Sequence, residues 1–296
     1  MNGLEVLATG PLTTVQDRGR RGLFRYGVGV AGAADRGALA LANRLVGNPE
    51  GHAALEVLLG GLEVRAAEPV VLAVTGAPTP VSVDGAPAPH SSVLVVGAGQ
   101  VLRLDPATAG LRAYVAVRGG VDAEPVLGSR SRDTLAGLGP APLVPGDRLA
   151  VGAPPARHPA LRTAPVPGPA TGTVTAGVVL GPRADWFTEP AVLFTGTWTV
   201  TPASDRVGLR LQRPAGQPGL ERARHDELPS EGVALGSLQV PPSGQPVLFG
   251  PDHPVTGGYP VVGVVRDADV DLLAQVRPGQ SLRFRPAPAA REVPAP

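Results

Sequence analysis

Glycine and proline are unusually frequent in this chain, and they limit the secondary structure it can form. The 296 residues include 40 glycines and 35 prolines, about a quarter of the chain, whereas an average protein has about 12%. Proline interrupts helices and central strands, and glycine destabilises both. The sequence therefore predicts a mainly β structure with frequent turns and a few short helices. Hydrophobic residues make up 43% and occur in short runs throughout, which is typical of a folded protein.

Charge and composition exclude several classes of function. The net charge is +1 and charged residues make up only 17%, so we expect neither nucleic acid nor a membrane as a partner. Cysteine is absent, which removes disulfides, thiolate nucleophiles and cysteine-ligated metals. All 26 basic residues are arginines, so the chain offers no lysine for a Schiff base or for a phosphate-binding loop.

The pattern of strands and turns predicts two β-rich domains. Strand-like runs occur in the first half at 55–59, 62–66, 70–75, 81–83, 93–96, 101–104 and 113–118, and in the second half at 174–180, 197–201, 209–211, 236–240, 247–249 and 261–265. This spacing is typical of barrels or sandwiches. We expect an N-terminal domain over 1–152, a proline-rich linker over 153–172, a C-terminal domain over 173–287 and a flexible tail over 288–296.

Local signals add turns and two helices. Gly60-Gly61 predicts a tight hairpin between its flanking strands, and Asp84-Gly85 predicts a second turn. A helix should begin after Asp35, which can cap it, and end near Gly47. A second short helix is expected over 268–276. The chain shows neither a secretory signal nor a run of about 18 apolar residues, so we expect a cytoplasmic protein.

Two frequent functional motifs lack the required context. Gly27, Gly29 and Gly32 match the dinucleotide-binding pattern G-x-G-x-x-G, but the preceding residues 17–26 are too charged for the buried strand that this pattern requires. We interpret the stretch as a loop whose glycines adopt positive φ. The histidines are isolated, with none at a helical metal-binding spacing, so no metal site is predicted; they are His52, His90, His158, His225 and His253.

Ser204, Asp205, Arg206 and Arg210 lie close together where the chain enters a predicted strand. An arginine here can hold a carboxylate or a carbamoyl group bidentately. An internal ion pair between Asp205 and an arginine, which would fix the turn, explains the same residues equally well. Both interpretations remain open at the level of sequence.

A second group of polar residues follows in the same predicted domain. Its members are Ser230, Glu231, Gln239, Asp252, Thr256 and Tyr259, with Gly257 and Gly258 between the last two. The glycines allow backbone to approach a ligand, and the hydroxyl and carboxyl groups can bind it or transfer protons. A plain hairpin turn also accounts for the glycines.

Several motifs, taken in order, resemble one family. They include GPLTTVQDRGRRG, GVAGAADRGALALANRLVGNPEGHAALEV, RGGV, VLGSRS, SDRVGLRL, SEGVALGSLQVPPSGQPV, TGGYPVVGVV and LAQVRPGQSLRF. Together they span roughly residues 10 to 285 and resemble the biotin-dependent carboxyltransferase-like family. That family includes the C subunit of bacterial ATP-dependent 5-oxoprolinase, the KipA regulators, allophanate hydrolase subunit 2 and the carboxyltransferase region of urea amidolyase.

The resemblance implies two cyclophilin-like β-barrel domains and a role in an assembly. It implies two partner proteins, a KipI-like B subunit and a LamB/YcsF-like A subunit, with a small amide or lactam as substrate. The expected function is therefore that of the C subunit in a 5-oxoprolinase, which converts 5-oxoproline to glutamate with ATP used at the level of the complex. Alternatives are a KipA-type protein that binds a KipI-like kinase inhibitor, and a biotin-dependent carboxyltransferase acting on urea or a related amide.

The resemblance also implies functional positions. The expected catalytic residues are Asp252, Glu231, Thr256 and Tyr259. The expected substrate-binding residues are Gln16, Asp17, Arg20, Ser204, Arg206, Arg210, Gln239, Gly257 and Gly258; Asp35, Asn43, Asp205 and Ser230 also match family motifs. One departure stands out, because Pro254 and Val255 occupy places where the family usually has glutamine and threonine. Their loss of hydrogen-bonding side chains favours a changed substrate or the regulatory alternative.

Overall fold

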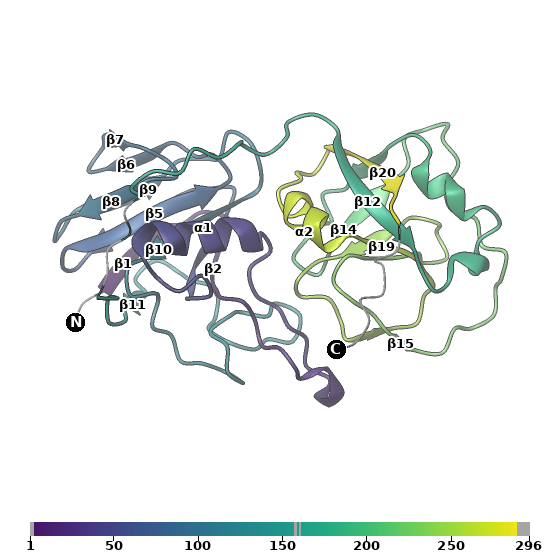
Figure 1. Cartoon of the computed structure of the whole chain (residues 1–296), viewed down its shortest axis with the longest axis horizontal. Coiled ribbons are helices and arrows are strands. Elements are labelled where there is room, and N and C mark those ends of the chain that lie inside the picture. Colours follow the sequence, from purple (N-terminus) through teal and green to yellow (C-terminus); the bar gives the residue numbers. More distant parts are fainter. Residues whose placement is uncertain (1–2, 157–158, 160, 289–296) are drawn as a thin grey trace. The chain divides into compact units, whose positions relative to one another are not determined.

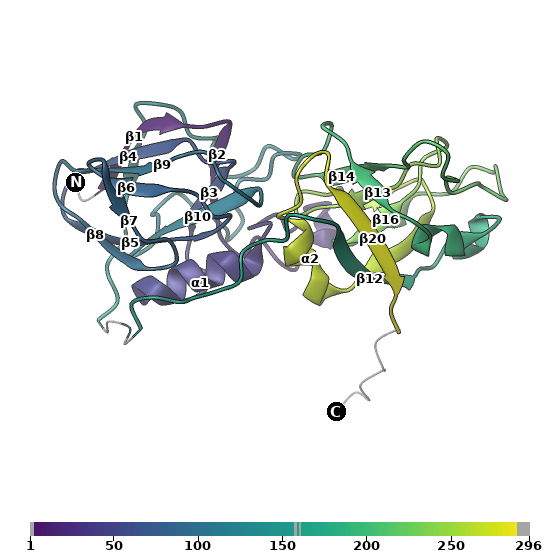
Figure 2. The same ribbon diagram turned by 90° about the horizontal axis from the view of Figure 1, so that it is seen from above.

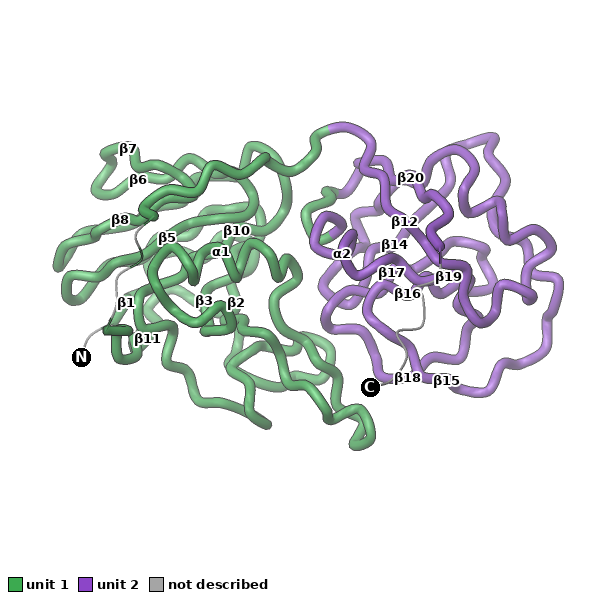
Figure 3. The backbone as a smooth tube through the Cα atoms, in the orientation of Figure 1, with its two compact units in different colours: residues 1–171, 274–277 green, residues 172–273, 278–296 purple. Residues whose placement is uncertain are grey.

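The computed structural model describes residues 3–156, 159 and 161–288, and the chain separates into two compact units (Figure 3). Unit 1 contains residues 1–171 and 274–277, and unit 2 contains residues 172–273 and 278–296. Both units are built mainly from strands, which confirms the mainly β prediction. His158 and nearly all of the expected tail lie outside the described residues. In the described part of the chain, no helix is long and apolar enough to cross a membrane.

Unit 1 contains two antiparallel sheets. The six-stranded sheet has the order β11 (Arg148–Ala150), β1 (Gly3–Thr9), β4 (Leu62–Ala66), β9 (Val101–Leu104), β6 (Val81–Val83) and β7 (Ala86–Ala88). The five-stranded sheet has the order β2 (Leu12–Gln16), β3 (Ala54–Leu58), β10 (Arg112–Val117), β5 (Val70–Gly76) and β8 (Val93–Val96). Alternate side chains of both sheets form the main core, which therefore lies between them.

Helix α1 (Arg36–Val46) covers the outer face of the five-stranded sheet (Figures 1 and 2). Asp35 caps its N-terminus, since Asp35 Oδ1 accepts a hydrogen bond from Ala38 N at 2.8 Å, and Gly47 ends it at φ 76°. Leu39 and Leu45 pack on Tyr114 and other residues of the sheet. The predicted helix is confirmed. It follows an antiparallel strand, so the glycine motif that precedes it does not lie in a parallel βαβ unit.

The predicted hairpin at Gly60-Gly61 is wrong. Strands β3 and β4 flank these glycines but belong to different sheets. Gly60 and Gly61 have φ of 84° and 81°, and a Cβ on Gly60 would lie 2.2 Å from the carbonyl oxygen of Asp105. The glycines therefore carry the chain tightly from one sheet to the other. The turn predicted at Asp84-Gly85, in contrast, does join β6 to β7.

Unit 2 is a closed barrel of seven strands. Around the barrel, these are β12 (Val174–Leu180), β19 (Val261–Val265), β16 (Ser237–Gln239), β17 (Val247–Phe249), β14 (Gly208–Gln212), β13 (Trp198–Val200) and β20 (Ser281–Pro286). An odd number of strands cannot alternate in direction all the way round, and the parallel pair is β12 with β20. Short elements surround the barrel: η2 (Ala184–Trp186), η3 (Pro190–Phe194), α2 (Asp267–Leu273), and a small sheet of β15 (Glu231–Gly232) with β18 (Thr256–Gly257).

Two stretches belong to unit 1 although the sequence placed them elsewhere. The described residues of the expected linker up to 171 belong to unit 1, where Val93 N donates a hydrogen bond to the Arg162 carbonyl oxygen at 2.8 Å. The helix expected over 268–276 ends at Leu273, because the next residues enter unit 1. There, Gln275 Oε1 accepts hydrogen bonds from Leu111 N and Arg112 N at 2.8 and 2.9 Å. These tertiary contacts override the helical period of the sequence.

Candidate functional site

Several polar loops of unit 2 meet at one end of its barrel. Strand registers place the end of β12, the end of β16 and the start of β19 side by side, since Leu180 lies opposite Gly263 and Gln239 opposite Val261. Residues 181–187 follow β12, residues 254–260 precede β19, and pairing of Phe187 with Arg222 brings residues 221–232 to them; we call these three loops the loop cluster. Pairing of Glu231 with Gly257 joins the second loop to the third. The cluster contains five of the predicted site residues, with Gln239 at its base.

An ion pair lies at the centre of the loop cluster. Arg183 Nε donates to Glu231 Oε2 at 3.0 Å, and Arg183 Nη2 donates to Glu231 Oε1. The two side chains are 36% and 30% exposed, so both remain accessible to a ligand. The hydrogen bonds and the positive charge of Arg183 lower the pKa of Glu231, and Glu231 raises the pKa of Arg183. Glu231 is therefore held as a carboxylate, which suits it to accept a hydrogen bond.

The segment from Thr256 to Tyr259 forms the adjoining wall. Gln239 Nε2 donates to the Tyr259 carbonyl oxygen at 3.1 Å and fixes this segment from below. A Cβ on Gly257 would lie 2.3 Å from Gln239 Nε2, so a larger residue there would displace the Gln239 amide from this hydrogen bond. Thr256 is exposed and Tyr259 is 45% exposed. The guanidinium of Arg222 lies 5.6 Å from the centre of the Tyr259 ring, a cation–π contact that orients the phenol.

Arg206 and Asp252 form a buried ion pair next to the cluster. Arg206 Nε and Nη2 donate to the two oxygens of Asp252 at 2.9 and 2.8 Å, and the side chains are 3% and 0% exposed. Both Asp252 oxygens are thus occupied beneath the surface, and the Arg206 fork faces Asp252 instead of a ligand. The sequence left open whether an arginine of this turn binds a ligand or pairs with Asp205. In the structure, the partner of Arg206 is Asp252.

The remaining residues of this turn brace the backbone. Asp205 Oδ1 accepts hydrogen bonds from Val207 N and Gly208 N at 2.8 and 3.1 Å. Ser204 Oγ accepts from Arg210 N at 2.9 Å, and Arg210 Nε donates to the Ala203 carbonyl oxygen at 3.2 Å. Their expected contact with substrate stays a prediction, whereas their contribution to the turn is observed.

The site residues predicted in unit 1 tie two loops together. Asp17 Oδ1 accepts hydrogen bonds from Ser129 Oγ at 2.7 Å and Ser131 Oγ at 2.5 Å, and Asp17 Oδ2 accepts from Arg130 N at 2.7 Å. Arg20 is 2% exposed and donates to the carbonyl oxygens of Val126 and Ser131. These residues therefore hold the loop after β2 against residues 126–132.

Three further residues of unit 1 are also engaged in the fold. Gln16 is 0% exposed and donates to Thr14 Oγ1 and the Arg132 carbonyl oxygen. Asp35 caps α1, and Asn43 Nδ2 donates to the His52 carbonyl oxygen at 2.8 Å. A substrate-binding role for Gln16, Asp17 and Arg20 stays a prediction.

Sequence reasoning missed Arg183 and Arg222. Arg183 lies 48 residues before its partner Glu231 and follows a strand in the stretch GPRADW, which matches no functional motif. Only the strand registers bring it to the cluster. Arg222 donates to the Val240 carbonyl oxygen at 2.7 Å and stands within a charged run, ERARHDE, that reads as an ordinary solvated loop.

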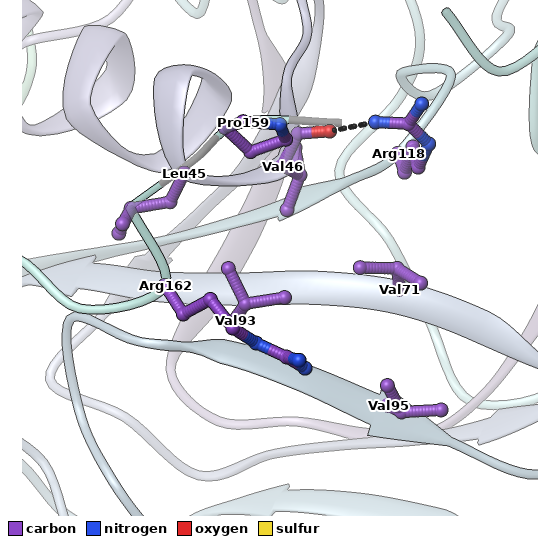
Figure 4. Close-up of a pocket in the computed structure, with 8 residues that line it drawn as sticks. All are labelled: Leu45, Val46, Val71, Val93, Val95, Arg118, Pro159 and Arg162. Carbon is purple, nitrogen blue, oxygen red and sulfur yellow. Dashed lines mark hydrogen bonds between the residues drawn. The ribbon is translucent and has the colours of Figure 1, made fainter. Parts of the chain in front are cut away.

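A cavity of about 300 Å³ lies elsewhere, beneath the C-terminal end of α1 in unit 1 (Figure 4). Its lining includes Val46, Val71 and Val93, with Arg118 and Arg162 at its edge. Arg118 Nη1 donates to the Val46 carbonyl oxygen at 2.8 Å, which uses that arginine to hold the end of the helix. None of the lining residues is a predicted site residue, and the walls are mostly aliphatic, so the loop cluster remains the candidate site.

Comparison with known proteins assigns the family. Residues 26–286 match the family described as "Carboxyltransferase domain, subdomain A and B". The chain belongs to this carboxyltransferase-domain family. The resemblance drawn from the sequence motifs is thereby confirmed, and the loop cluster lies within the matched stretch.

Two kinds of relative share this domain. The chain is 36% identical to the C subunit of 5-oxoprolinase from Escherichia coli over 95% of this chain and 90% of that protein. It is 32% identical to urea amidolyase of Saccharomyces cerevisiae over 96% of this chain but only 16% of that protein. Both names appear among the family members implied by the sequence motifs.

Solved structures have the same fold. The crystal structure of TTHA0988 superposes with a TM-score of 0.85 at 33% identity and covers 96% of this chain. The structure of Kluyveromyces lactis urea amidolyase superposes with a TM-score of 0.88 at 31% identity and covers 96% of this chain. The chain spans about half of the TTHA0988 chain, 55%, and 18% of the amidolyase chain.

The buried pair makes a testable prediction about stability. Asp252→Ala leaves the Arg206 guanidinium buried without its counter-charge, which should lower the free energy of unfolding by about 3–5 kcal/mol. Urea unfolding followed by tryptophan fluorescence measures this in unit 2, because both tryptophans, Trp186 and Trp198, lie there. The double variant R206M/D252L should recover most of the loss. The exposed Asp226→Ala serves as the control, and an Asp252→Ala protein as stable as this control would contradict the structural role.

The exposed pair makes a prediction about protonation. Arg183→Gln removes the charge that lowers the pKa of Glu231, so this pKa should rise toward the ordinary glutamate value. The contribution of the pair to stability is present near neutral pH and is lost as the pH falls through the lowered pKa. An NMR titration of the ¹³C-labelled Glu231 carboxyl measures the shift. Arg224→Gln, which breaks the exposed pair with Asp185, is the control; no upward shift in Arg183→Gln would refute the assigned cause.

Proposed function

We propose that this chain is the C subunit of an ATP-dependent 5-oxoprolinase, which converts 5-oxoproline to glutamate together with two other subunits. The observation that carries this proposal is the 36% identity that extends over 90% of the corresponding E. coli protein. The match to urea amidolyase covers a far smaller part of that protein. The partners proposed are a KipI-like B subunit and a LamB/YcsF-like A subunit, and we propose a cytoplasmic assembly because it consumes ATP.

The loop cluster offers the groups that lactam hydrolysis requires. A lactam presents a carbonyl oxygen, which needs hydrogen-bond donors as negative charge develops on it, and a ring N–H, which needs an acceptor. Thr256 and Tyr259 supply exposed hydroxyl donors. Glu231, held as a carboxylate by Arg183, supplies the acceptor and is suited to orient an attacking water.

The substrate carboxylate is assigned to Arg183. Its Nε and Nη2 atoms bind Glu231, and the guanidinium carries a further nitrogen, Nη1, on its accessible side chain. Asp252, in contrast, is assigned a positioning role, because its buried carboxylate orients the backbone that leads to Thr256. We assign the ATP-dependent step to the assembly and no residue of this chain to ATP.

Carboxyl transfer to urea or a related amide is a second candidate, favoured by the TM-score of 0.88 with urea amidolyase. The sequence contains no lysine, so biotin would have to arrive on a separate carrier and would bring the carboxyl group. Its ureido ring has N–H donors and a carbonyl acceptor, which match the Glu231 carboxylate and the Thr256 and Tyr259 hydroxyls. Those residues would hold the ring.

The argument for a KipA-type regulatory role is that Pro254 and Val255 stand where the family usually has glutamine and threonine. In the structure, His253 Nδ1 lies 2.7 Å from the Pro254 carbonyl oxygen, and Val233 N donates to the Val255 carbonyl oxygen at 3.0 Å. Both positions thus contribute main-chain groups that hold the loop cluster together.

The proposal is tested by ATP-dependent release of glutamate from 5-oxoproline, with the purified chain mixed with the subunits encoded beside it and each omitted in turn. Activity should require this chain, and Glu231→Gln should lower kcat by about 100-fold, the scale expected when a group that positions a reactant is lost. Glu189→Gln, an exposed carboxylate of unit 2, should retain the wild-type rate. A stable but inactive wild-type complex would favour regulation, and biotin-dependent carboxylation of urea would favour the second candidate.

A further inference from the structure

Two neighbouring loops of unit 1 form an exposed tip that the proposed chemistry does not use. They are residues 17–27, which include η1 (Phe24–Tyr26), and residues 126–132; we call them the docking loops. Figure 1 shows η1 as the short purple turn at the end of the long loop between β2 and α1. Asp17 and Arg20 join the two loops through the hydrogen bonds described above. The tip is thus held in place although it lies outside the sheets.

The docking loops expose large apolar side chains. Phe24 is 45% exposed and Tyr26 is 65% exposed, in a chain with only ten aromatic residues. Other aromatic side chains such as Tyr114, Trp198 and Phe284 are buried, and Tyr259 of the loop cluster is exposed. A single exposed aromatic is ordinary, but two on one short turn are a feature of interaction surfaces, and the second docking loop adds an exposed leucine.

That leucine, Leu127, occupies a position that favours other residues. Leu127 and Gly128 are the two central residues of a tight turn between Val126 and Ser129, with φ of 53° and 82°. Such turns favour asparagine or glycine, because a larger side chain is strained at positive φ. Leu127 is nevertheless 55% exposed. A leucine with positive φ and an exposed side chain does not stabilise this turn, so we infer that the side chain contacts another molecule.

The same loops are strongly basic. Residues 17–27 and 126–132 contain six arginines and one acid, Asp17, whereas the whole chain has a net charge of +1. Asp17 is engaged in the hydrogen bonds that join the loops. Among the ion pairs of the described residues, Arg21 and Arg25 have no carboxylate partner, and the Arg25 guanidinium lies 4.8 Å from the centre of the Tyr26 ring. The tip therefore presents aromatic rings flanked by arginines available for carboxylates.

We propose that the docking loops bind another protein of the assembly, at an apolar pocket rimmed by aspartate or glutamate. Phe24, Tyr26 and Leu127 would enter the pocket, and Arg21 and Arg25 would pair with its rim. Aromatic residues and arginine are the residues that contribute most at protein interfaces. The polar network under the loops orders them before binding, which lowers the entropic cost of association. This inference rests on the proposed function, since that function supplies the assembly.

The test measures the affinity of the full-length chain for each subunit encoded beside it, by biolayer interferometry. Leu127→Asn should leave the melting temperature unchanged or higher, because asparagine suits the turn, yet weaken binding several-fold. The double variant F24S/Y26S should weaken binding by about tenfold or more, as expected for interface hot spots. R21E/R25E should do the same and should remove most of the salt dependence. Val144→Ser, which removes an apolar side chain 56% exposed elsewhere on unit 1, should bind as the wild type.

The outcomes separate this inference from the proposed function. Wild-type binding that the three docking-loop variants weaken supports it. If the variants bind as tightly as the wild type and their complexes release glutamate, the docking surface is overturned and the proposed function stays intact. Absence of any complex overturns both. Capture of a single-stranded oligo(dT) by the wild type, lost in F24S/Y26S, would assign the tip to nucleic acid instead.

Discussion

The buried pair of Arg206 and Asp252 holds the part of unit 2 on which the candidate site depends. It joins the turn before β14 to the segment after β17, and Asp252 N also donates to the Arg206 carbonyl oxygen at 3.1 Å. The segment that begins at Asp252 continues directly into Thr256 and Gly257, which pair with Glu231 and Gly232. An uncompensated charge in this position would be costly, so the two side chains remain together or the segment is displaced. The geometry of the loop cluster is therefore set from beneath by groups that do not touch a ligand.

In unit 1, too, buried polar side chains hold loops in place. A chain with so many glycines and prolines has long loops whose backbone groups have no neighbouring strand to pair with, and such groups must find other partners. The Asp17 carboxylate accepts four hydrogen bonds from the two docking loops, and Gln275 Oε1 accepts hydrogen bonds from the main chain of Leu111 and Arg112. Buried polar side chains thus take the place of regular structure. Arginine suits this task because its fixed fork reaches several acceptors at once.

Much of the fold follows from local sequence. Alternating apolar residues located most strands, and Asp35 with Gly47 located α1, because these signals act over a few residues. Pairing between strands did not follow, as the wrong hairpin at Gly60-Gly61 shows, since a pair of glycines with positive φ also fits a crossing between sheets. Residues 274–276 were expected to be helical but lie outside α2, because distant groups of unit 1 bind them.

The candidate site was predictable in part for the same reason. Glu231, Gln239, Thr256 and Tyr259 belong to motifs in loops of one barrel, and the structure brings them together. Asp252 also stands in such a loop, but its partner lies 46 residues away, so nothing local shows that its carboxylate is buried. Arg183 was missed because its pairing with Glu231 depends on strand register, which a single sequence does not display.

If the loop cluster binds the lactam within the assembled enzyme, substrate should protect its backbone from exchange. Hydrogen–deuterium exchange of the complex, with and without 5-oxoproline and ATP, measures this. We expect slower exchange in peptides from residues 181–187, 229–233 and 254–260 when the substrates are present. Slower exchange confined to other subunits or to unit 1, in a complex that turns over, would contradict it.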